Sequence, residues 1–363
     1  MTINRMKKEM GKKVLVAMSG GVDSSVAAFL LKQEGYDIAG VTMCLGIREG
    51  DDRIRCCGPT AVEDAKRVCE RLKIPHYVLD YADELEKKVI AKFVSEYVRG
   101  RTPNPCVDCN RYLKFGNLLE KAKLLGFDFF ATGHYAAVER NGTRYYLKRP
   151  KDRRKDQTYF LYPVPYEGLR SILFPLASLT KEEVRDLAKK ASLPVAEKRE
   201  SQDICFVTQK NYHAFLSERV EGLKPGPIVN AQGNILGTHR GMIFYTIGQR
   251  GGLRISHRAP LYVIAIDAKN NRIVVGEKEE LKAGGLMAGN VNLLAESWPE
   301  KVYAKIRYRK KEAPCVVVFK ANRVRVTFTE KQEAIAPGQS VVFYADDCVL
   351  GGGEIEEVLH GTC

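Results

Sequence analysis

The chain has 363 residues, of which 45% are hydrophobic, and its formal net charge is +14. This length and apolar content exclude a disordered protein and predict two or three folded domains. The charge favours a polyanionic partner, with nucleic acid the first choice and a membrane surface the second. No apolar run is long enough for a membrane span or a signal-peptide core, so we expect a cytoplasmic protein with mostly reduced cysteines and no membrane partner.

The first half of the chain alternates apolar runs with amphipathic segments. Residues 12–18 contain an apolar run typical of a strand buried on both faces of a parallel sheet, and helical spacing follows over 24–36, where Gly35 can end the helix. Further strands are expected at 37–43, 76–81 and 128–134, and further helices at 60–72, 84–98 and 115–126. This order predicts an α/β domain with a doubly wound parallel sheet, in which ligands bind beyond the carboxyl ends of the strands.

The junction between the first strand and the first helix reads SGGVDSS, residues 19–25. Gly20 and Gly21 allow close backbone approach, the serines add hydroxyl donors, and the helix that follows presents its positive end to an anion. Asp23 is a hard oxygen ligand suited to Mg²⁺. The stretch lacks the Gly-Lys-Ser/Thr of a Walker A loop and is not a GxGxxG dinucleotide fingerprint. A phosphate site is favoured over the alternative of a glycine-rich structural turn.

A second motif, TPNPCVDCN at residues 102–110, places Cys106 and Cys109 in a Pro-rich loop. This spacing is compatible with a metal site, a redox disulfide or a catalytic thiol. A zinc site needs four ligands, and Cys56 and Cys57 are the candidates to complete the set, although adjacent cysteines suit it poorly. The residues alone leave these alternatives open.

In the rest of the chain, the pattern changes from alternating helices and strands to mostly strands. An Asn-Gly hairpin signal at 139–146 leads into a stretch rich in Lys and Arg at 146–157, which is either a solvated face or a phosphate-contact loop. A helix at 178–194 carries the capping box Thr180 to Glu183. Short strands with Gly and Asn turns follow residue 211. We therefore expect a catalytic domain over 1–210, a small β domain over 211–285 and a C-terminal β-barrel with RNA contacts over 286–363.

The motifs together carry a family resemblance. SGGVDSS resembles the PP-loop of the N-type ATP pyrophosphatases, which have an adenine nucleotide alpha hydrolase-like fold. GRTPNPCVDCNRYLKF, ATGHYA, KDQTYFL and SQDICF follow in that order. Over nearly the whole chain, this set closely resembles the tRNA-specific 2-thiouridylases of the MnmA/TrmU type. The resemblance implies ATP- and Mg²⁺-dependent 2-thiolation of the wobble uridine (position 34) in tRNAs for Glu, Gln and Lys, with sulfur from a persulfide donor protein.

The residue types suit this chemistry. The C2 carbonyl oxygen of uracil is a poor leaving group, and transfer of AMP from ATP makes it a good one. A sulfur nucleophile can then displace AMP at C2. Because the reactive form is an anion, its thiols are expected in an electropositive, partly exposed setting.

The resemblance also implies roles for individual residues. It makes Cys109 the first catalytic cysteine and Cys205 the persulfide carrier. The two cysteines would be left joined by a disulfide after sulfur transfer. The implied ATP-binding residues are Ala17, Met18, Ser19, Gly20, Gly21, Val22, Asp23, Ser24, Met43 and Gly133. The implied target-base pocket consists of Asn104, Pro105 and Cys106, although relatives often carry Asp at the position of Cys106. The implied tRNA contacts are His134, Lys155, Asp156, Gln157, Arg307, Tyr308 and Gln339.

Three alternatives stay open at this point. Cys106, Cys109 and Cys205 could hold a [4Fe-4S] cluster whose open iron carries sulfide to the substrate. The chain could be another PP-loop adenylating enzyme, which would turn over ATP without tRNA. It could also be a non-catalytic RNA-binding protein with a metal-stabilised cysteine loop.

Overall fold

The computed structural model describes residues 11–48, 54–55, 59–200, 204–207 and 212–361. They belong to two compact units, each described here by itself. The α/β unit comprises residues 1–88, 106–208 and 346–349, and the β-rich unit comprises 89–105, 209–345 and 350–363.

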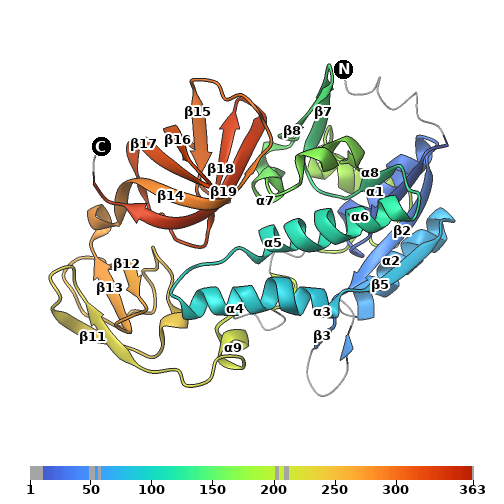
Figure 1. Ribbon diagram of the computed structural model, residues 1–363. Helices are drawn as coiled ribbons and strands as arrows, with labels where there is room; N and C mark the ends of the chain where they lie inside the picture. The colour runs from blue at the N-terminus through green and yellow to red at the C-terminus, as the bar shows by residue number, and fades with distance from the viewer. Residues whose placement is uncertain (1–10, 49–53, 56–58, 201–203, 208–211, 362–363) are drawn as a thin grey trace. The chain divides into compact units, whose positions relative to one another are not determined.

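A five-stranded parallel sheet with the strand order β5-β2-β1-β6-β9 forms the centre of the α/β unit, and its neighbouring strands β2 and β5 are labelled in Figure 1. Its strands are β1 (Lys13–Ala17), β2 (Asp37–Cys44), β5 (His76–Asp80), β6 (Phe129–Ala131) and β9 (Ile172–Leu173). β1 lies between β2 and β6, and its residues Val14, Leu15 and Val16 are at most 1% exposed. The predicted doubly wound α/β class is confirmed.

The strand order reverses direction at β1. The chain proceeds from β1 to β2 and β5 on one side, and then returns to place β6 against the other side of β1. The segments that follow β1 and β6 therefore flank the switch point of the sheet, where open α/β sheets bind their ligands.

Three helices contribute to the main core of this unit: α1 (Val22–Gln33), α2 (Pro59–Leu72) and α8 (Lys181–Lys190). Val26, Val68 and Val184 pack in one cluster with the residues of β1. α1 begins two residues earlier than the predicted helix and ends before Gly35, whose φ of +85° is typical of a helix stop. The capping box of Thr180 and Glu183 at the start of α8 is confirmed.

The cysteine motif lies at the start of a helix rather than wholly in a loop, which corrects the prediction. After α3 (Ala82–Leu85), the π-helical segment η3 (Glu86–Ile90) and α4 (Ala91–Val98), the chain forms α5 (Pro105–Asp108), the π-helical η4 (Cys109–Leu118) and α6 (Leu119–Leu124). The prolines had suggested a loop throughout. Pro105 instead occupies the first position of α5, where its missing N–H costs nothing and its fixed φ suits a helix.

The remaining elements of the α/β unit are short. The predicted hairpin is formed by β7 (Ala137–Asn141) and β8 (Arg144–Lys148), with Gly142 at φ +60° in the turn. The others are β3 (Ile47–Arg48), β4 (Ile54–Arg55), the 3-10 helices η5 (Arg153–Lys155) and η6 (Tyr166–Ser171), and α7 (Thr158–Leu161).

The β-rich unit contains α4 and a four-stranded sheet of order β11-β10-β13-β12. Its strands are β10 (Gly226–Val229), β11 (Ile235–His239), β12 (Tyr262–Asp267) and β13 (Arg272–Gly276), and α9 (Tyr212–Ser217), η7 (Met242–Phe244) and η8 (Lys278–Leu281) accompany them. Ile228, Val263 and Ile273 are completely buried. The predicted small β region is therefore present.

A closed antiparallel barrel follows (Figure 1). Its strands are β14 (Lys282–Leu293), β15 (Val302–Lys305), β16 (Ala313–Lys320), β17 (Arg323–Glu333), β18 (Ser340–Ala345) and β19 (Cys348–Leu359). They follow the order β14-β17-β16-β15-β18-β19, and pairing of β14 with β19 closes the ring. Leu286, Val326 and Phe343 are completely buried in its core. This confirms the predicted barrel.

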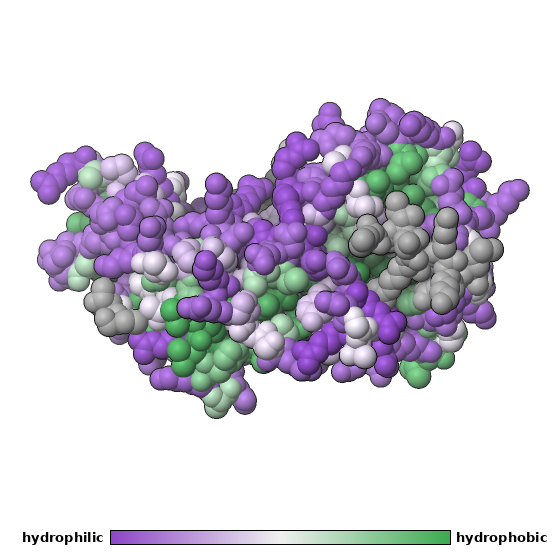
Figure 2. All heavy atoms as spheres, turned by 90° about the horizontal axis from the view of Figure 1, so that it is seen from above, coloured by the Kyte–Doolittle hydropathy of each residue, from purple (hydrophilic) through white to green (hydrophobic). Residues whose placement is uncertain are grey.

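Within the described ranges, no helix is both long and apolar enough to cross a membrane. The face seen in Figure 2 is mostly hydrophilic.

Candidate active site

The turn between β1 and α1 lies at the switch point of the sheet and is shaped by glycine. Gly20 has φ +66°, and a Cβ on it would lie 2.2 Å from the carbonyl oxygen of Ala61 in α2. Any side chain at this position would push the turn away from α2. The turn is therefore held close to a neighbouring helix, as the glycine pattern predicted.

The first turn of α1 offers backbone donors to an anion. Gly21 is the N-cap residue and has no side chain to cap the helix. The hydroxyl of Ser24 accepts the backbone N–H of Ser19 at 3.2 Å and donates to the carbonyl of Gly21 at 3.2 Å, while Ser25 donates to the same carbonyl at 2.8 Å. These bonds fix the turn, and the helix end retains the positive potential that suits a phosphate.

Asp23 takes part in an ion-pair network. Its carboxylate accepts from Nζ of Lys181 at 2.6 and 2.8 Å and from the hydroxyl of Tyr135 at 3.0 Å. Lys181 also contacts Glu200 at 2.8 Å, and Lys155 contacts Glu200 at 2.7 Å. Asp23 fits a hard cation such as Mg²⁺ because its side chain is 32% exposed, but it would have to exchange Lys181 for the metal.

The lysines determine the charge state of Glu200. Burial alone would raise the pKa of this carboxyl, but the hydrogen bonds from Lys155 and Lys181 outweigh burial and lower the pKa of Glu200 to about 2. The side chain of Lys181 is only 8% exposed. Glu200 is therefore ionised, and Lys181 links the Asp23 turn to the segment that leads toward Cys205.

A second lysine also contacts the turn. Nζ of Lys198 donates to the carbonyl of Gly20 at 3.0 Å and to the carboxylate of Asp64 at 2.6 Å. Burial would raise the pKa of Asp64, but the contacts with Lys198 and Arg67 lower it overall. The residues just before Cys205 thus hold the turn through Lys198 and Glu200.

The segment after β6 approaches the turn closely. A Cβ on Gly133 would lie 2.6 Å from the backbone nitrogen of Ser24 and 2.7 Å from the carbonyl carbon of Asp23. The structure therefore explains the glycine by contact between two backbones, in addition to the nucleotide contact implied by the resemblance. This contact joins the segments that follow β1 and β6.

His134 is held inside the α/β unit. Its Nδ1 lies 2.8 Å from the hydroxyl of Thr132, and its ring packs near Phe115 and Phe174. Burial, with help from the charge of Lys114, lowers the pKa of His134 well below its usual range. The imidazole is therefore neutral at physiological pH.

Cys106 and Cys109 lie near the start of the helical region, and neither is in a disulfide. Cys106 is exposed and Cys109 is half-buried. Burial raises the pKa of the Cys109 thiol, the charge of Lys114 opposes this effect, and Asp108 adds to it. The Cys106 side chain keeps some contact with solvent, but protein atoms packed around its thiol desolvate it and raise the pKa of Cys106 to about 11. The electropositive setting expected for a reactive thiol is present only in part, and both thiols are protonated at neutral pH.

Cys205 is an exposed thiol on a turn, beside the buried Phe206. Within the described ranges, no group of three or more His, Cys, Asp or Glu residues is arranged to hold a metal ion. Cys106, Cys109 and Cys205 are all described, so the structure does not assemble them as a cluster site. Cys56 and Cys57, the candidates for completing a zinc site, lie outside the described residues.

The other nucleotide candidates lie at the carboxyl ends of β1 and β2. Ala17 ends β1, Met18 is 3% exposed, and Met43 is the penultimate residue of β2. Val22 begins α1 and is 5% exposed. Met18 and Val22 belong to the core under the turn.

The three tRNA-contact candidates at 155–157 form hydrogen bonds or ion pairs within the α/β unit. The carboxylate of Asp156 is buried and accepts from the backbone N–H and hydroxyl of Thr158, at 2.9 and 2.6 Å. The Gln157 side chain accepts from the backbone N–H of Tyr135 at 2.8 Å. Together with the pairing of Lys155 with Glu200, these bonds connect the basic stretch to the site.

The remaining candidates belong to the β-rich unit. The Gln339 amide donates to the carbonyls of Thr102 and Pro103 at 2.9 and 3.2 Å, so it anchors the backbone just before Asn104 and Pro105. Pro105 is buried and Asn104 is half-buried.

Two further candidates occupy the segment after β15. Arg307 donates to the carbonyl of Ile247 at 2.8 Å. Nζ of Lys305 lies 5.7 Å from the centre of the Tyr308 ring. Arg307 and Tyr308 are both half-buried.

Comparison with known proteins gives the family. Family models match residues 12–209 (tRNA methyl transferase HUP domain), 213–277 (tRNA methyl transferase PRC-barrel domain) and 283–355 (Aminomethyltransferase beta-barrel domain). The tRNA-specific 2-thiouridylase MnmA 1 of Syntrophus aciditrophicus (strain SB) is 60% identical over 349 residues, which cover 96% of this chain and 94% of that protein. The MnmA of Carboxydothermus hydrogenoformans (strain ATCC BAA-161 / DSM 6008 / Z-2901) is 50% identical over 359 residues, covering 96% and 98%. The chain belongs to the tRNA-specific 2-thiouridylase family.

The family models and the relatives differ in wording. The models' descriptions speak of methyl transfer, whereas the relatives are named for thiolation. Identity of 50–60% over nearly the full length of both chains supports the relatives' name. Among solved structures, a 4-thiouridine synthetase–RNA complex with bound ATP has TM-score 0.37 at 18% identity, covering 58% of this chain and 50% of that chain. A similarity of this size does not bear on function.

Sequence reasoning missed four side chains at the site of this 2-thiouridylase: Lys181, Lys198, Tyr135 and Glu200. Lys181 lies in the first turn of α8 next to the capping Thr180. The sequence pattern predicts the cap but indicates no role for the lysine. Lys198 and Glu200 lie in a charged stretch that reads as a solvated surface. No local signal identifies them, because Lys181 and Lys198 find their partners 158 and 134 residues away in the chain, and Glu200 pairs with Lys155, which is 45 residues away.

Proposed function

We propose that this chain transfers sulfur to C2 of the wobble uridine of tRNA, with ATP as the activating substrate. The observation that carries the proposal is the full-length match to relatives named tRNA-specific 2-thiouridylase. The site supports it, because a turn suited to an anion lies at the switch point of the sheet, and the half-buried thiol of Cys109 and the exposed thiol of Cys205 follow in the matching motifs. We further propose that tRNAs for Glu, Gln and Lys are the substrates, that a persulfide protein donates the sulfur, and that the reaction takes place in the cytoplasm.

The first step is adenylation. Uracil O2 attacks the α-phosphate of ATP, the bond between the α- and β-phosphates breaks, and pyrophosphate leaves. The first-turn amides of α1 bind the phosphates, and Gly20 and Gly133 allow the close approach of backbone that this needs. Asp23 would hold Mg²⁺, which neutralises phosphate charge when bound.

The second step is sulfur transfer. The terminal sulfur of a persulfide on Cys205 attacks C2 and forms a C–S bond. Cys109 then attacks the inner sulfur of Cys205, so that the S–S bond to the transferred sulfur breaks and a Cys109–Cys205 disulfide forms. AMP leaves with the original O2, and the C2 thiocarbonyl remains. An external thiol reductant must reopen the disulfide before the next turnover.

The structure indicates how thiol reactivity is controlled. Since the pKa of Cys109 is raised, its thiol is protonated in this structure, and the proton must be removed before Cys109 attacks. Lys114 is the group that favours the thiolate, while Asp108 disfavours it. We propose Lys114 as the residue that stabilises the Cys109 thiolate.

The remaining site residues receive the following proposed roles. The ATP-binding set is Ala17, Met18, Ser19, Gly20, Gly21, Val22, Asp23, Ser24, Met43 and Gly133, and the target-base pocket is Asn104, Pro105 and Cys106. The tRNA-binding set is His134, Lys155, Asp156, Gln157, Arg307, Tyr308 and Gln339. Asp156, Gln157 and Gln339 already bond within the protein, so we expect their substitution to affect folding as well as binding.

The test uses Cys→Ser variants in a thiolation assay with unmodified tRNA, ATP, Mg²⁺ and a low-molecular-weight persulfide. Cys109→Ser and Cys205→Ser should each abolish 2-thiouridine while tRNA binding stays within about twofold of the unaltered protein. Cys348→Ser is the control, because Cys348 lies on β19 and has no role in the mechanism. No thiolated nucleoside from folded protein with any of the three tRNAs would refute the proposal.

The same assay distinguishes a cluster mechanism. Iron-free protein should be fully active, and Cys106→Ser should remain active because Cys106 forms no bond to the transferred sulfur. Activity that depends on iron, and that is lost in all three variants Cys106→Ser, Cys109→Ser and Cys205→Ser, would establish the [4Fe-4S] route instead. ATP turnover without tRNA would indicate another PP-loop enzyme.

A further inference from the structure

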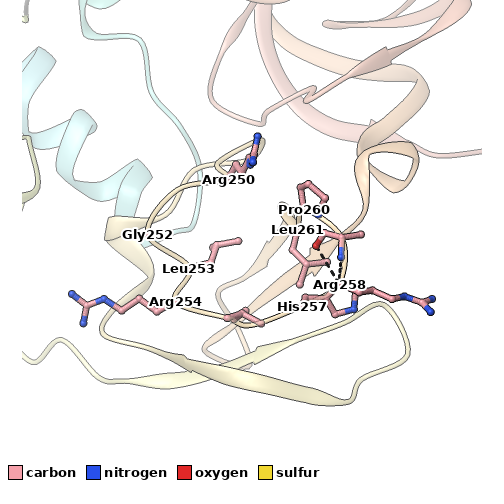
Figure 3. A pocket seen from close by; sticks show the side chains of 10 residues that line it. Arg250, Gly252, Leu253, Arg254, His257, Arg258, Pro260 and Leu261 are labelled. Carbon is pink, nitrogen blue, oxygen red and sulfur yellow. Dashed lines mark hydrogen bonds between the residues drawn. The ribbon is translucent and has the colours of Figure 1, made fainter.

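A hollow in the β-rich unit has no role in the proposed chemistry. It has a volume of about 360 Å³ and lies within the loop that leads from η7 to β12 (Figure 3). Arg250, Arg254 and Arg258 lie on its rim, and Leu253 and Leu261 form part of its lining. The exposed surface of the hollow is more polar than apolar, and a hollow with several cations on its rim suits an anionic ligand.

The cations of the rim are available to a ligand. Arg250, Arg254 and Arg258 are all exposed. No carboxylate forms an ion pair with any of them in the described part of the chain. Arg272, in the neighbouring strand β13, differs because it is paired with Asp267 at 2.8 Å.

The backbone that carries these arginines is firmly held. The N–H of Gly248 donates to the carbonyl of Val263 at 2.8 Å, and the N–H of Val263 donates to the carbonyl of Gln249 at 2.9 Å. Leu253 and Leu261 are 6% and 9% exposed and anchor the loop. A ligand therefore meets a formed surface, which lowers the entropy cost of binding.

One arginine occupies a strained position. Arg254 has φ +54°, in the left-handed region that non-glycine residues seldom adopt. Glycine would adopt this conformation more easily, so the backbone conformation does not explain why residue 254 is an arginine.

The arginines diverge rather than converge. In Figure 3 the side chains of Arg254 and Arg258 extend from the loop on opposite sides, and Arg250 lies at a third point of the rim. A single small anion would be bound by cations that point toward one centre. Separated cations around a hollow suit a polymer whose negative charges are themselves spaced, with the hollow receiving a ribose or base between two phosphates.

We propose that this hollow and its arginine rim bind the sugar–phosphate backbone of the RNA substrate. The identity of that RNA rests on the proposed function, whereas the site itself rests on the geometry of the loop. The hollow lies apart in sequence from every residue to which the family resemblance gives a tRNA contact, so it adds a contact region to that set.

The test removes two rim charges without disturbing the backbone. Arg254→Gly keeps the left-handed φ favourable, and it is combined with Arg258→Ala. The control is Lys224→Ala with Lys269→Ala, which removes the same charge from exposed positions of the same unit outside the hollow. The dissociation constant for unmodified tRNA is measured by filter binding over a range of NaCl concentrations.

The rim variant should bind tRNA roughly 5- to 30-fold more weakly at about 0.15 M salt. The slope of log affinity against log salt should fall by about 2, because two phosphate contacts are lost. The control pair should change neither quantity appreciably. Thermal unfolding of each variant shows whether it is folded, and Arg250→Ala with Arg258→Ala provides a second rim variant that leaves residue 254 unchanged.

Two results would overturn the inference. One is unchanged tRNA affinity and salt slope in both rim variants. The other is displacement of tRNA from the rim by low millimolar inorganic phosphate, which would indicate a site for a small anion. Failure of the proposed function is distinguishable, because the unaltered protein would then make no 2-thiouridine while the rim variants still lost tRNA affinity.

Discussion

Gly133→Ala tests whether contact between the two segments at the switch point controls ATP binding. The added Cβ would lie 2.6 Å from the nitrogen of Ser24 and 2.9 Å from its Cα, whereas ordinary contacts begin near 3.4 Å. One backbone must therefore move by roughly 0.8 Å, because no flexible side chain can yield in its place. Gly133 has no positive φ, so alanine is conformationally allowed and the effect is steric.

The expected effect has two parts. Overpacking of this kind costs about 1–3 kcal/mol of unfolding free energy. A displacement of nearly 1 Å at the phosphate-binding turn should lower kcat/KM for ATP roughly 10- to 100-fold. Urea unfolding measures the first quantity, and tRNA-dependent release of pyrophosphate measures the second.

A matched control is available in the β-rich unit. Gly361 has no positive φ and no atom within 4 Å of an added Cβ, so Gly361→Ala should leave both quantities unchanged. Normal ATP kinetics in a folded Gly133→Ala protein would refute the argument that the backbone contact positions the turn.

Three further predictions concern the charges around the site. Lys181→Met should lower the unfolding free energy by about 1–3 kcal/mol, because Asp23 and Glu200 lose the cation that they share. The control Lys189→Met breaks only an exposed ion pair and should lower it by less than about 0.5 kcal/mol. Equal losses of stability in the two variants on thermal unfolding would contradict this prediction. Because the pKa of Glu200 is lowered from 4.5 to about 2, its ionised carboxylate stabilises the fold at pH values above 4.5, and this stabilisation is lost as the pH falls toward 2. The unfolding free energy measured with urea should therefore fall by about 1–2 kcal/mol less on acidification in Glu200→Gln than in the unaltered protein. Parallel curves of unfolding free energy against pH for the two proteins would count against the lysine contacts. Alkylation of Cys109 by iodoacetamide should be slow at neutral pH, accelerate above pH 9 and become slower still in Lys114→Met; a fast reaction at pH 7 would show that the thiol is already ionised.

The sequence predicts features that depend on local pattern. The buried run at 14–16, the helix stop at Gly35 and the Asn-Gly hairpin each follow from neighbouring residues, and the structure has all three. Because glycine has no side chain, the residue type alone predicts that another backbone lies close to the glycines of the turn. Their contact partners, Ala61 for Gly20 and Ser24 for Gly133, could be identified only from the fold.

Other features depend on partners far along the chain. Lys181 reads as an ordinary first-turn lysine, yet the fold places it between Asp23 and Glu200. Pro105 was misread because proline favours loops and helix starts alike, and only the residues after it decide between them. The prediction of an electropositive thiol site overlooked the burial of Cys109, which depends on how the helix packs.

The central claim is tested most directly by measuring both products of a single turnover. Protein carrying a persulfide on Cys205 is mixed with unmodified tRNA, Mg²⁺ and ATP, with iron excluded, and 2-thiouridine and AMP are quantified together. The account predicts one AMP for each 2-thiouridine, no turnover of ATP when tRNA is omitted, and a Cys109–Cys205 disulfide at the end of the reaction. Formation of AMP without any 2-thiouridine, or of 2-thiouridine by Cys205→Ser protein, would contradict it.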